Sequence, residues 1–111
     1  MYLMAYLTAA NEDEARRIAK TLVEERLAAC VNILGRIDSV YHWEGAVQSS
    51  EEIAFLAKTT EACFDALAAR VRELHSYDLP CVVAVPLALG EAAFLGWIGE
   101  NVRPGSNSNI V

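Results

Sequence analysis

Two long stretches of alternating residues in the middle of this chain limit the folds that it can adopt. From residue 27 side chains alternate between apolar and polar faces, and after a break at LGR (residues 34–36) the alternation continues to Trp43. The segment 49–60 (SSEEIAFLAKTT) alternates again beyond Gly45. Such a period of two places successive side chains on opposite faces of a β-strand. The sequence therefore predicts two long strands, with Gly45 between them.

The segment before these strands predicts a shorter strand and a helix. Residues 2–9 (YLMAYLTA) form a nearly continuous apolar run, which is typical of a strand covered on both faces. Asn11 followed by Glu14 is a capping-box pattern, in which each side chain satisfies a free amide at a helix start. Apolar residues then recur at helical spacing at Ala15, Ile18, Ala19, Leu22 and Val23. This spacing predicts an amphipathic helix.

The segment after the long strands predicts a second helix, a strand and a short last helix. Thr60 is suited to cap a helix that begins at Glu61. The run from residue 81 is typical of a strand up to Pro86, which has no N–H for a central ladder. Residues 91–102 (EAAFLGWIGENV) fit a short helix. We expect one domain over residues 1–103 and a mobile tail over residues 104–111.

This order of elements predicts an α+β fold. A strand, a helix, two long strands, a helix and a strand close naturally into a split βαβ sandwich, with helices on one face of an antiparallel sheet. The other face of such a sheet is bare, yet both faces of the long strands carry apolar residues. A monomer would expose this apolar patch, so the pattern favours self-association.

Charge and cysteine content exclude several classes of function. The formal net charge of the 111-residue chain is -6 and its pI is about 4.8. Nucleic-acid binding requires a basic surface, so we expect no such partner. The apolar run at the N-terminus is too short to span a membrane and is followed by acidic residues, so we expect neither a membrane partner nor an export signal. Three widely spaced cysteines favour reduced thiols and a cytoplasmic location.

The histidines and cysteines show no clustered spacing. His42, His75, Cys30, Cys63 and Cys81 form neither CxxC nor HxxxH, the spacings by which structural metal sites are normally found. We therefore expect no structural metal and no cofactor that folding requires. A cysteine nucleophile needs a base and an electropositive environment. His75 could be that base if the fold brings it close to a thiol, but free cysteine is more often a small buried residue.

The sequence leaves the roles of Lys58 and His75 open. Lys58 shares a face with Glu52 in an otherwise apolar strand, so either its stem lets the ammonium reach solvent or the ammonium pairs with a carboxylate in a pocket. His75 ends a predicted helix, where the carbonyl dipole favours a cation. Tyr77 and Pro80 predict a rigid turn into the last strand.

Five segments occur in the order and spacing of the CutA divalent-cation tolerance family: RLAACVNI, SVYHWEG, EEIAFLAKTT, HSYDLPCVVAVP and FLGWI. The chain resembles this family from its first predicted strand to its last helix. The resemblance implies a ferredoxin-like fold and a tight homotrimer in which the long strands of neighbouring subunits join edge to edge. It also implies a cytoplasmic location and a link to copper tolerance. No reaction comes with it.

Individual positions carry this resemblance. The matching residues are Cys30 in AAC, then Tyr41, Trp43 and Gly45 in YxWxG, then Glu52, Lys58, Thr59, His75, Tyr77, Pro80, Pro86 and Trp97. Three positions depart from the family: Ser76 stands where proline is usual, Cys81 stands where glutamate is usual, and Leu7 leaves the first strand without a thiol or imidazole. The missing glutamate removes a carboxylate that could pair with Lys58 or accept a metal.

We expect a ligand pocket at the junction between subunits, formed by Cys30, Lys58, His75 and Tyr77. Lys58 would supply a positive charge, Tyr77 a hydroxyl, and His75 an imidazole that is the candidate metal ligand. Cys30 would be either a soft donor or a small buried hydrophobe.

The large aromatic residues are expected to make the contacts between subunits. Strand alternation places Tyr41 and Trp43 on one face and His42 on the other. We expect Tyr41, Trp43 and Trp97 to pack in the trimer, where aromatic rings bury large areas, and His42 to be a surface residue.

Two functions from different classes follow. The first is a trimeric cytoplasmic binding or signalling module, similar to PII-like regulators, that recognises a metal ion or small anion. Copper or another divalent cation is the candidate ligand, and no residue is assigned a catalytic role. The second is a thiol-based metal handler or weak enzyme that uses Cys30 or Cys81 with His75.

Overall fold

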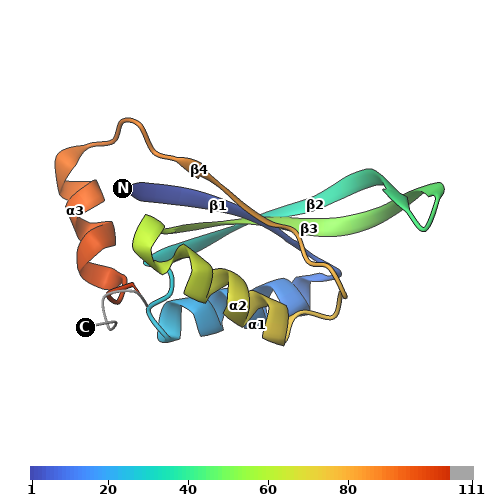
Figure 1. Ribbon diagram of the computed structural model, residues 1–111, viewed down its shortest axis with the longest axis horizontal. Helices are drawn as coiled ribbons and strands as arrows, with labels where there is room; N and C mark the ends of the chain where they lie inside the picture. The colour runs from blue at the N-terminus through green and yellow to red at the C-terminus, as the bar shows by residue number, and fades with distance from the viewer. Residues whose placement is uncertain (106–111) are drawn as a thin grey trace.

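A long antiparallel hairpin is the largest feature of the computed structural model, which describes residues 1–105 (Figure 1). The elements are β1 (Tyr2–Ala9), α1 (Glu12–Glu24), β2 (Cys30–Trp43), β3 (Ala46–Thr60), the 3-10 helix η1 (Glu61–Cys63), α2 (Phe64–Leu74), β4 (Val82–Pro86) and α3 (Ala92–Asn101). The hairpin is formed by β2 and β3. Its turn is Glu44-Gly45, with φ of 52° and 79°. Positive φ at both turn residues gives a two-residue turn whose twist matches that of the strands.

The four strands form one antiparallel sheet in the order β2-β3-β1-β4. Both long helices, α1 and α2, lie on one face of this sheet, and α3 lies beside its end near the N-terminus (Figure 1). The predicted α+β class and ferredoxin-like arrangement are therefore confirmed. No helix within residues 1–105 is long and apolar enough to cross a membrane.

The hydrophobic core lies between the sheet and the two long helices. Its largest fully buried side chains include Leu7, Ile18, Leu22, Phe55, Leu67 and Ile98. In β1, and in β3 from Ile53 onward, the odd-numbered residues point into this core, as Leu7 and Phe55 do in their paired positions. The even-numbered residues of both strands therefore face away from the helices.

The distal part of the hairpin extends beyond the helices. Strand β1 pairs with β3 from Thr60 back to Ile53. Between Ile53 and the hairpin turn, β3 pairs only with β2 among the described strands. We call residues 37–52 the arm, and Figure 1 shows it projecting past α1 and α2. A register shift between Ile33 and Gly35 precedes the arm, and Gly35 has a φ of 124°. Such an irregularity bends a strand locally.

The two helix caps predicted from the sequence are present in the structure. The Asn11 side chain accepts a hydrogen bond from Glu14 N at 2.8 Å, and the Thr60 side chain accepts one from Cys63 N at 3.3 Å. The helix predicted to begin at Glu61 opens with the 3-10 turn η1 and becomes α-helical only at Phe64.

The first long strand begins later than predicted. Leu27 and Ala28 donate their backbone N–H groups to Leu22 O, which closes the end of α1, and Ala29 N then bonds Lys58 O. Strand β2 therefore starts at Cys30 instead of Leu27. The apolar residues at positions 27–29 are buried in this connection, which explains why they resemble a strand.

The C-terminal segment packs against η1. Val102 is buried, Arg103 N donates to Arg26 O at 2.8 Å, and Gly105 is buried beside Ala62. The predicted mobile tail over residues 104–111 lies for the most part outside the described residues and stays a prediction.

Candidate functional site

The face of the sheet opposite α1 and α2 is not covered by helices within residues 1–105, and we call it the bare face (Figure 1). Residues paired directly across strands share a face, so the ladders define its members. They include Met4 and Tyr6 on β1, Cys30, Asn32, Tyr41 and Trp43 on β2, Ser50, Glu52, Leu56 and Lys58 on β3, and Val83 and Val85 on β4. Val83 and Val85 are 56% and 52% exposed. The bare face thus combines apolar, aromatic and charged groups.

One end of the bare face carries Lys58. This residue pairs with Cys30 on β2 and with Met4 on β1, and its ammonium donates a hydrogen bond to the Asn32 side chain. Within residues 1–105 the ammonium has no ion pair with Glu52, Asp78 or another carboxylate. The positive charge is therefore held by an amide, and no carboxylate within residues 1–105 neutralises it.

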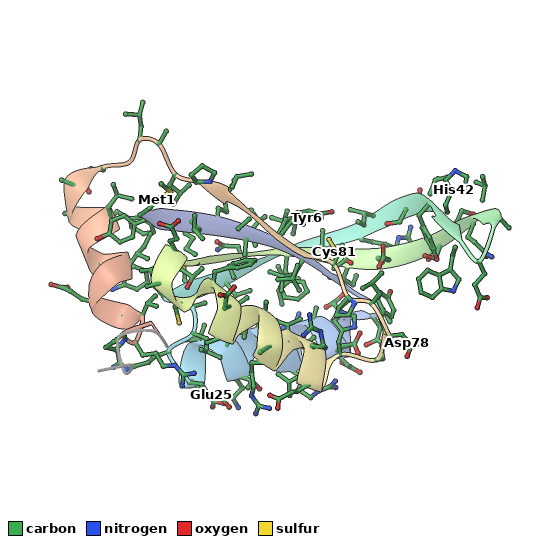
Figure 2. All side chains as sticks on the ribbon, in the orientation of Figure 1. Met1, Tyr6, Glu25, His42, Asp78 and Cys81 are labelled. Atoms are coloured by element: carbon green, nitrogen blue, oxygen red, sulfur yellow. The ribbon has the colours of Figure 1, made fainter. Side chains whose placement is uncertain are left out.

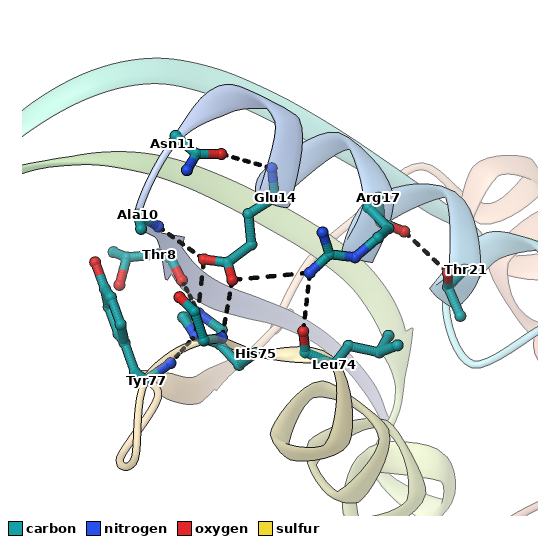
Figure 3. Close-up of polar contacts among 10 residues, drawn as sticks. Thr8, Ala10, Asn11, Glu14, Arg17, Thr21, Leu74, His75 and Tyr77 are labelled. Carbon is teal, nitrogen blue, oxygen red and sulfur yellow. Dashed lines mark hydrogen bonds and ion pairs between the residues drawn. The ribbon is translucent and has the colours of Figure 1, made fainter.

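His75 lies at the other end, where it terminates α2 (Figure 3). Its side chain is fully buried, and its Nε2 lies 2.7 Å from Thr8 O. The Nδ1 atom accepts the backbone N–H of Tyr77 at 3.1 Å. Because Thr8 O only accepts and Tyr77 N only donates, the ring proton belongs on Nε2.

The candidate metal ligand His75 is thus engaged at both ring nitrogens. A metal ion could bind it only after one of these two hydrogen bonds is broken, so a ligand role for His75 stays a prediction. His75 ends α2 as predicted, and its imidazole is buried against β1.

Glu14 lies next to His75 and is almost completely buried (Figure 3). One oxygen accepts Ala10 N at 2.9 Å, and the other accepts Ser76 N at 2.8 Å. Arg17 lies 3.8 Å from this carboxylate. Burial by itself raises the pKa of Glu14, but the hydrogen bonds from Ala10 and Ser76 hold that pKa below its ordinary value.

Tyr77 connects this network to the bare face. Its ring centroid lies 4.5 Å from that of His75, and its hydroxyl donates to Glu52 at 2.9 Å. Burial, with the hydrogen bond and charge of Glu52, raises the pKa of Tyr77 well above its ordinary value. Burial and the charge of Glu52 also raise the pKa of the Cys81 thiol. This end of the bare face is therefore electronegative.

Within one chain, the four predicted pocket residues form two separate pairs. Cys30 and Lys58 are direct cross-strand neighbours, whereas His75 and Tyr77 lie against each other near Thr8. Thr8 pairs with β3 four residues away from Lys58, which corresponds to about 13 Å at the usual rise of a strand. A single pocket would require one pair from each of two subunits.

Sequence reasoning missed two carboxylates of this site. Glu14 carried a signal, since the capping box marks it, but its oxygens bind Ala10 and Ser76 instead of the Asn11 amide. Alternation places Glu52 on the same face as Lys58, whereas the structure pairs Glu52 with Tyr77. The bonds from Ser76 to Glu14 and from Tyr77 to Glu52 do not follow from local periodicity, because each joins segments that are distant in sequence.

The aromatic residues predicted to pack between subunits are exposed in the single chain. Tyr41 and Trp43 are each 42% exposed, and Tyr41 forms a hydrogen bond with Ser50 across the arm. Trp97 on α3 is 39% exposed and lies 5.4 Å from Phe94 between ring centroids. Figure 2 shows the exposed His42 near the tip of the arm. Packing between subunits stays a prediction for these residues.

The described residues contain no ready-made metal centre, and two of the cysteines are poor nucleophiles by their raised pKa values. Over residues 1–105, no group of three or more His, Cys, Asp and Glu side chains is arranged to hold a metal ion. All three cysteines are free, and burial raises the pKa of the Cys63 thiol as it does that of Cys81. A raised pKa keeps a thiol protonated, so these two cysteines are poorly suited to nucleophilic chemistry.

Comparison with known proteins identifies the family. A family model described as "CutA1 divalent ion tolerance protein" matches residues 3–101. The chain belongs to this CutA1 family. A CutA divalent-cation tolerance protein from Thermus thermophilus is 48% identical over 95 residues, which cover 86% of this chain and 92% of that protein. The CutA protein from Archaeoglobus fulgidus is 43% identical over 103 residues, which cover 93% of this chain and 100% of that protein.

Solved structures from CutA1 family members agree with the fold. The T. thermophilus structure has a TM-score of 0.91 at 46% identity and covers 93% of this chain and 100% of its own. An A. fulgidus structure, described as a periplasmic divalent cation tolerance protein, has a TM-score of 0.89 with the same coverage of both chains. The predicted family resemblance is therefore confirmed.

Proposed function

We propose that this CutA1 family member acts in divalent-cation tolerance as a trimeric binding or signalling module. Family membership supports a role in metal tolerance. The observation that carries the finer proposal is the bare face, where exposed apolar residues lie between a positive end at Lys58 and an electronegative end at Glu52. Exposed apolar patches rimmed by polar groups mark interaction sites.

The proposed ligand site lies where two subunits meet. Trimer formation would cover the bare face and place Cys30 and Lys58 of one subunit near His75 and Tyr77 of another. Lys58 suits a small anion, because its ammonium has no carboxylate partner within residues 1–105. The electronegative end around Glu52 suits a metal ion such as copper.

The alternative of a thiol-based metal handler or weak enzyme has less support. The raised pKa of Cys81 disfavours its thiolate, and both nitrogens of His75 are engaged in hydrogen bonds. We therefore propose binding without catalysis. Isothermal titration of the reduced protein with Cu(II), Cu(I), Zn(II) and common nucleotides tests this choice. Saturation at a fixed stoichiometry without turnover supports the binding module, whereas turnover or the absence of binding by every probe contradicts it.

We also propose a cytoplasmic location, because the three cysteines are free and suit a reducing compartment. One family member from A. fulgidus is described as periplasmic. Cell fractionation with compartment markers tests the proposal, and recovery of the native protein with an extracytoplasmic marker would contradict it.

A further inference from the structure

Ser76 supplies a backbone N–H at a position where the CutA resemblance leads one to expect proline. This amide nitrogen lies 2.8 Å from an oxygen of Glu14. A proline has no amide hydrogen, so it could not donate this bond. The departure from the family pattern therefore adds a contact between α1 and the segment that follows α2.

Two consecutive amides of that segment are held by buried side chains. Ser76 N donates to Glu14, and Tyr77 N donates to Nδ1 of His75 at 3.1 Å. The side chains of Glu14 and His75 are 6% and 0% exposed, so water does not compete freely for either acceptor. The imidazole is fixed in turn by its bond to Thr8 O. The backbone that carries Tyr77 is thus tied to α1 and to β1.

The position of the Tyr77 ring depends on this backbone. Its centroid lies 4.5 Å from that of His75, and its hydroxyl reaches Glu52 on β3 at 2.9 Å. We infer that Glu14 and His75 are positioning residues that hold the Tyr77 hydroxyl on Glu52 through the backbone N–H groups of Ser76 and Tyr77. The inference deepens the proposed function and rests on it, since Tyr77 belongs to the proposed ligand site.

The substitution Ser76→Pro tests the contact with Glu14. His75 has a φ of -83° and a ψ of 147°, which is the extended conformation that a residue before proline prefers. Ser76→Pro therefore removes the N–H without straining His75. Ser76→Ala is the matched control, because it keeps the N–H and loses the hydroxyl, which also hydrogen-bonds Glu14.

The measurement is the chemical shift of the Tyr77 ring carbon Cζ at neutral pH, in protein labelled with 13C-tyrosine, because this carbon carries the hydroxyl that donates to Glu52. The signal that is lost in Tyr77→Phe identifies this residue among the four tyrosines. We expect Ser76→Pro to move this signal away from its native position, and Ser76→Ala to move it less. Circular dichroism of each variant confirms that the fold persists.

The substitution His75→Phe tests the second contact, with His42→Phe on the exposed arm as its control. We expect only His75→Phe to move the Tyr77 signal away from its native position. If His75→Phe does not fold, Ser76→Pro decides the outcome. A variant that loses stability while the Tyr77 signal stays at its native position would overturn the inference, because the contact would then be structural alone.

A calorimetric titration of the native protein and Ser76→Pro with Cu(II) and with inorganic phosphate separates this inference from the proposed function. If the Tyr77 signal moves in Ser76→Pro but the native protein binds neither probe, the positioning role stands and the proposed ligand site fails. If the native protein binds a probe and the Tyr77 signal does not move, the proposed function stands and the positioning role fails.

Discussion

Glu14 is a buried carboxylate whose charge is satisfied mainly by backbone N–H groups from two segments of the chain. Ala10 precedes its helix, and Ser76 follows α2. Hydrogen bonds to a carboxylate favour its ionised form and can outweigh the cost of burial. At the scale of single residues, this one side chain therefore ties the start of α1 to the turn that presents Tyr77.

The hydrogen bonds of Glu14 predict how the free energy of unfolding depends on pH. The pKa of Glu14 in the folded chain is below its ordinary value, so its stabilising contribution is present above about pH 4.3, the unfolded value, and is lost as pH falls through the folded value. We expect Glu14→Gln to lower the free energy of unfolding at pH 7 by about 1–3 kcal/mol, because glutamine offers one acceptor oxygen in place of two. Urea denaturation at neutral and acidic pH measures both effects.

Glu12→Gln provides the control for this prediction. Glu12 is exposed and pairs with Arg16 on the helix surface, so its substitution should cost less than about 1 kcal/mol. The native protein should lose more stability on acidification than Glu14→Gln does. Equal losses for the two proteins would show that Glu14 is not the titrating group.

Lys58 allows a separate prediction, since its ammonium is bonded to Asn32 and has no carboxylate partner within residues 1–105. We expect Lys58→Met to change the free energy of unfolding by no more than about 1 kcal/mol and to abolish binding of inorganic phosphate. Thermal melting and calorimetry of this variant measure the two quantities. A loss of about 3–5 kcal/mol, with the trimer disrupted, would instead indicate a buried ion pair between subunits.

The arm is an element whose length is visible in the sequence but whose boundaries are not. Alternation predicted the two long strands, and Gly45 marked their turn, which the structure confirms. The start at Leu27 was wrong because apolar residues in a buried connection alternate like those of a strand. The turn also uses Glu44 at positive φ, which a propensity argument does not favour.

The candidate site was only partly predictable from the sequence. Family resemblance pointed to Lys58, His75 and Tyr77, and each lies at the bare face or next to it. His75 is buried where its Nε2 bonds Thr8 O and its Nδ1 accepts the backbone N–H of Tyr77. Contacts between residues that are distant in sequence leave no local period, so the sequence alone did not predict the burial of this histidine.

The C-terminal segment is the second element that can be tested. A Cβ atom added at Gly105 would lie 2.3 Å from the carbonyl oxygen of Ala62, whereas one added at Gly96 in α3 meets no atom within 4 Å. We expect Gly105→Ala to destabilise the chain by about 1–3 kcal/mol through overpacking. Gly96→Ala should be neutral or stabilise by about 0.5–1 kcal/mol. Denaturant unfolding of both variants measures the difference, and equal effects would contradict the close packing at Gly105.

At the scale of the whole molecule, folding should not depend on a metal. The core joins the sheet to α1 and α2, and no ready-made metal cluster occurs in residues 1–105. The large binding energy that drives metal-dependent folds is therefore not needed. We expect excess chelator to leave the far-ultraviolet circular dichroism spectrum unchanged, and loss of the spectrum would contradict this account.

The bare face and the arm are the surfaces through which we propose that the chain assembles. Exposed valines on β4, aromatic residues on the arm and the Phe94–Trp97 pair on α3 leave apolar area that a soluble monomer rarely exposes. Strand β2 also has an unpaired edge in the described sheet, which offers backbone groups to another chain. Burial of these groups in a trimer would make stability depend on protein concentration.

Sedimentation equilibrium of the native protein at micromolar concentration tests the proposed trimer. We expect a single species with three times the 12.1 kDa mass of the chain. This mass should persist on dilution until the fold itself is lost, because a trimer would bury the bare face and the strand edge. A folded species of 12.1 kDa that is stable at this concentration would contradict the proposed trimer.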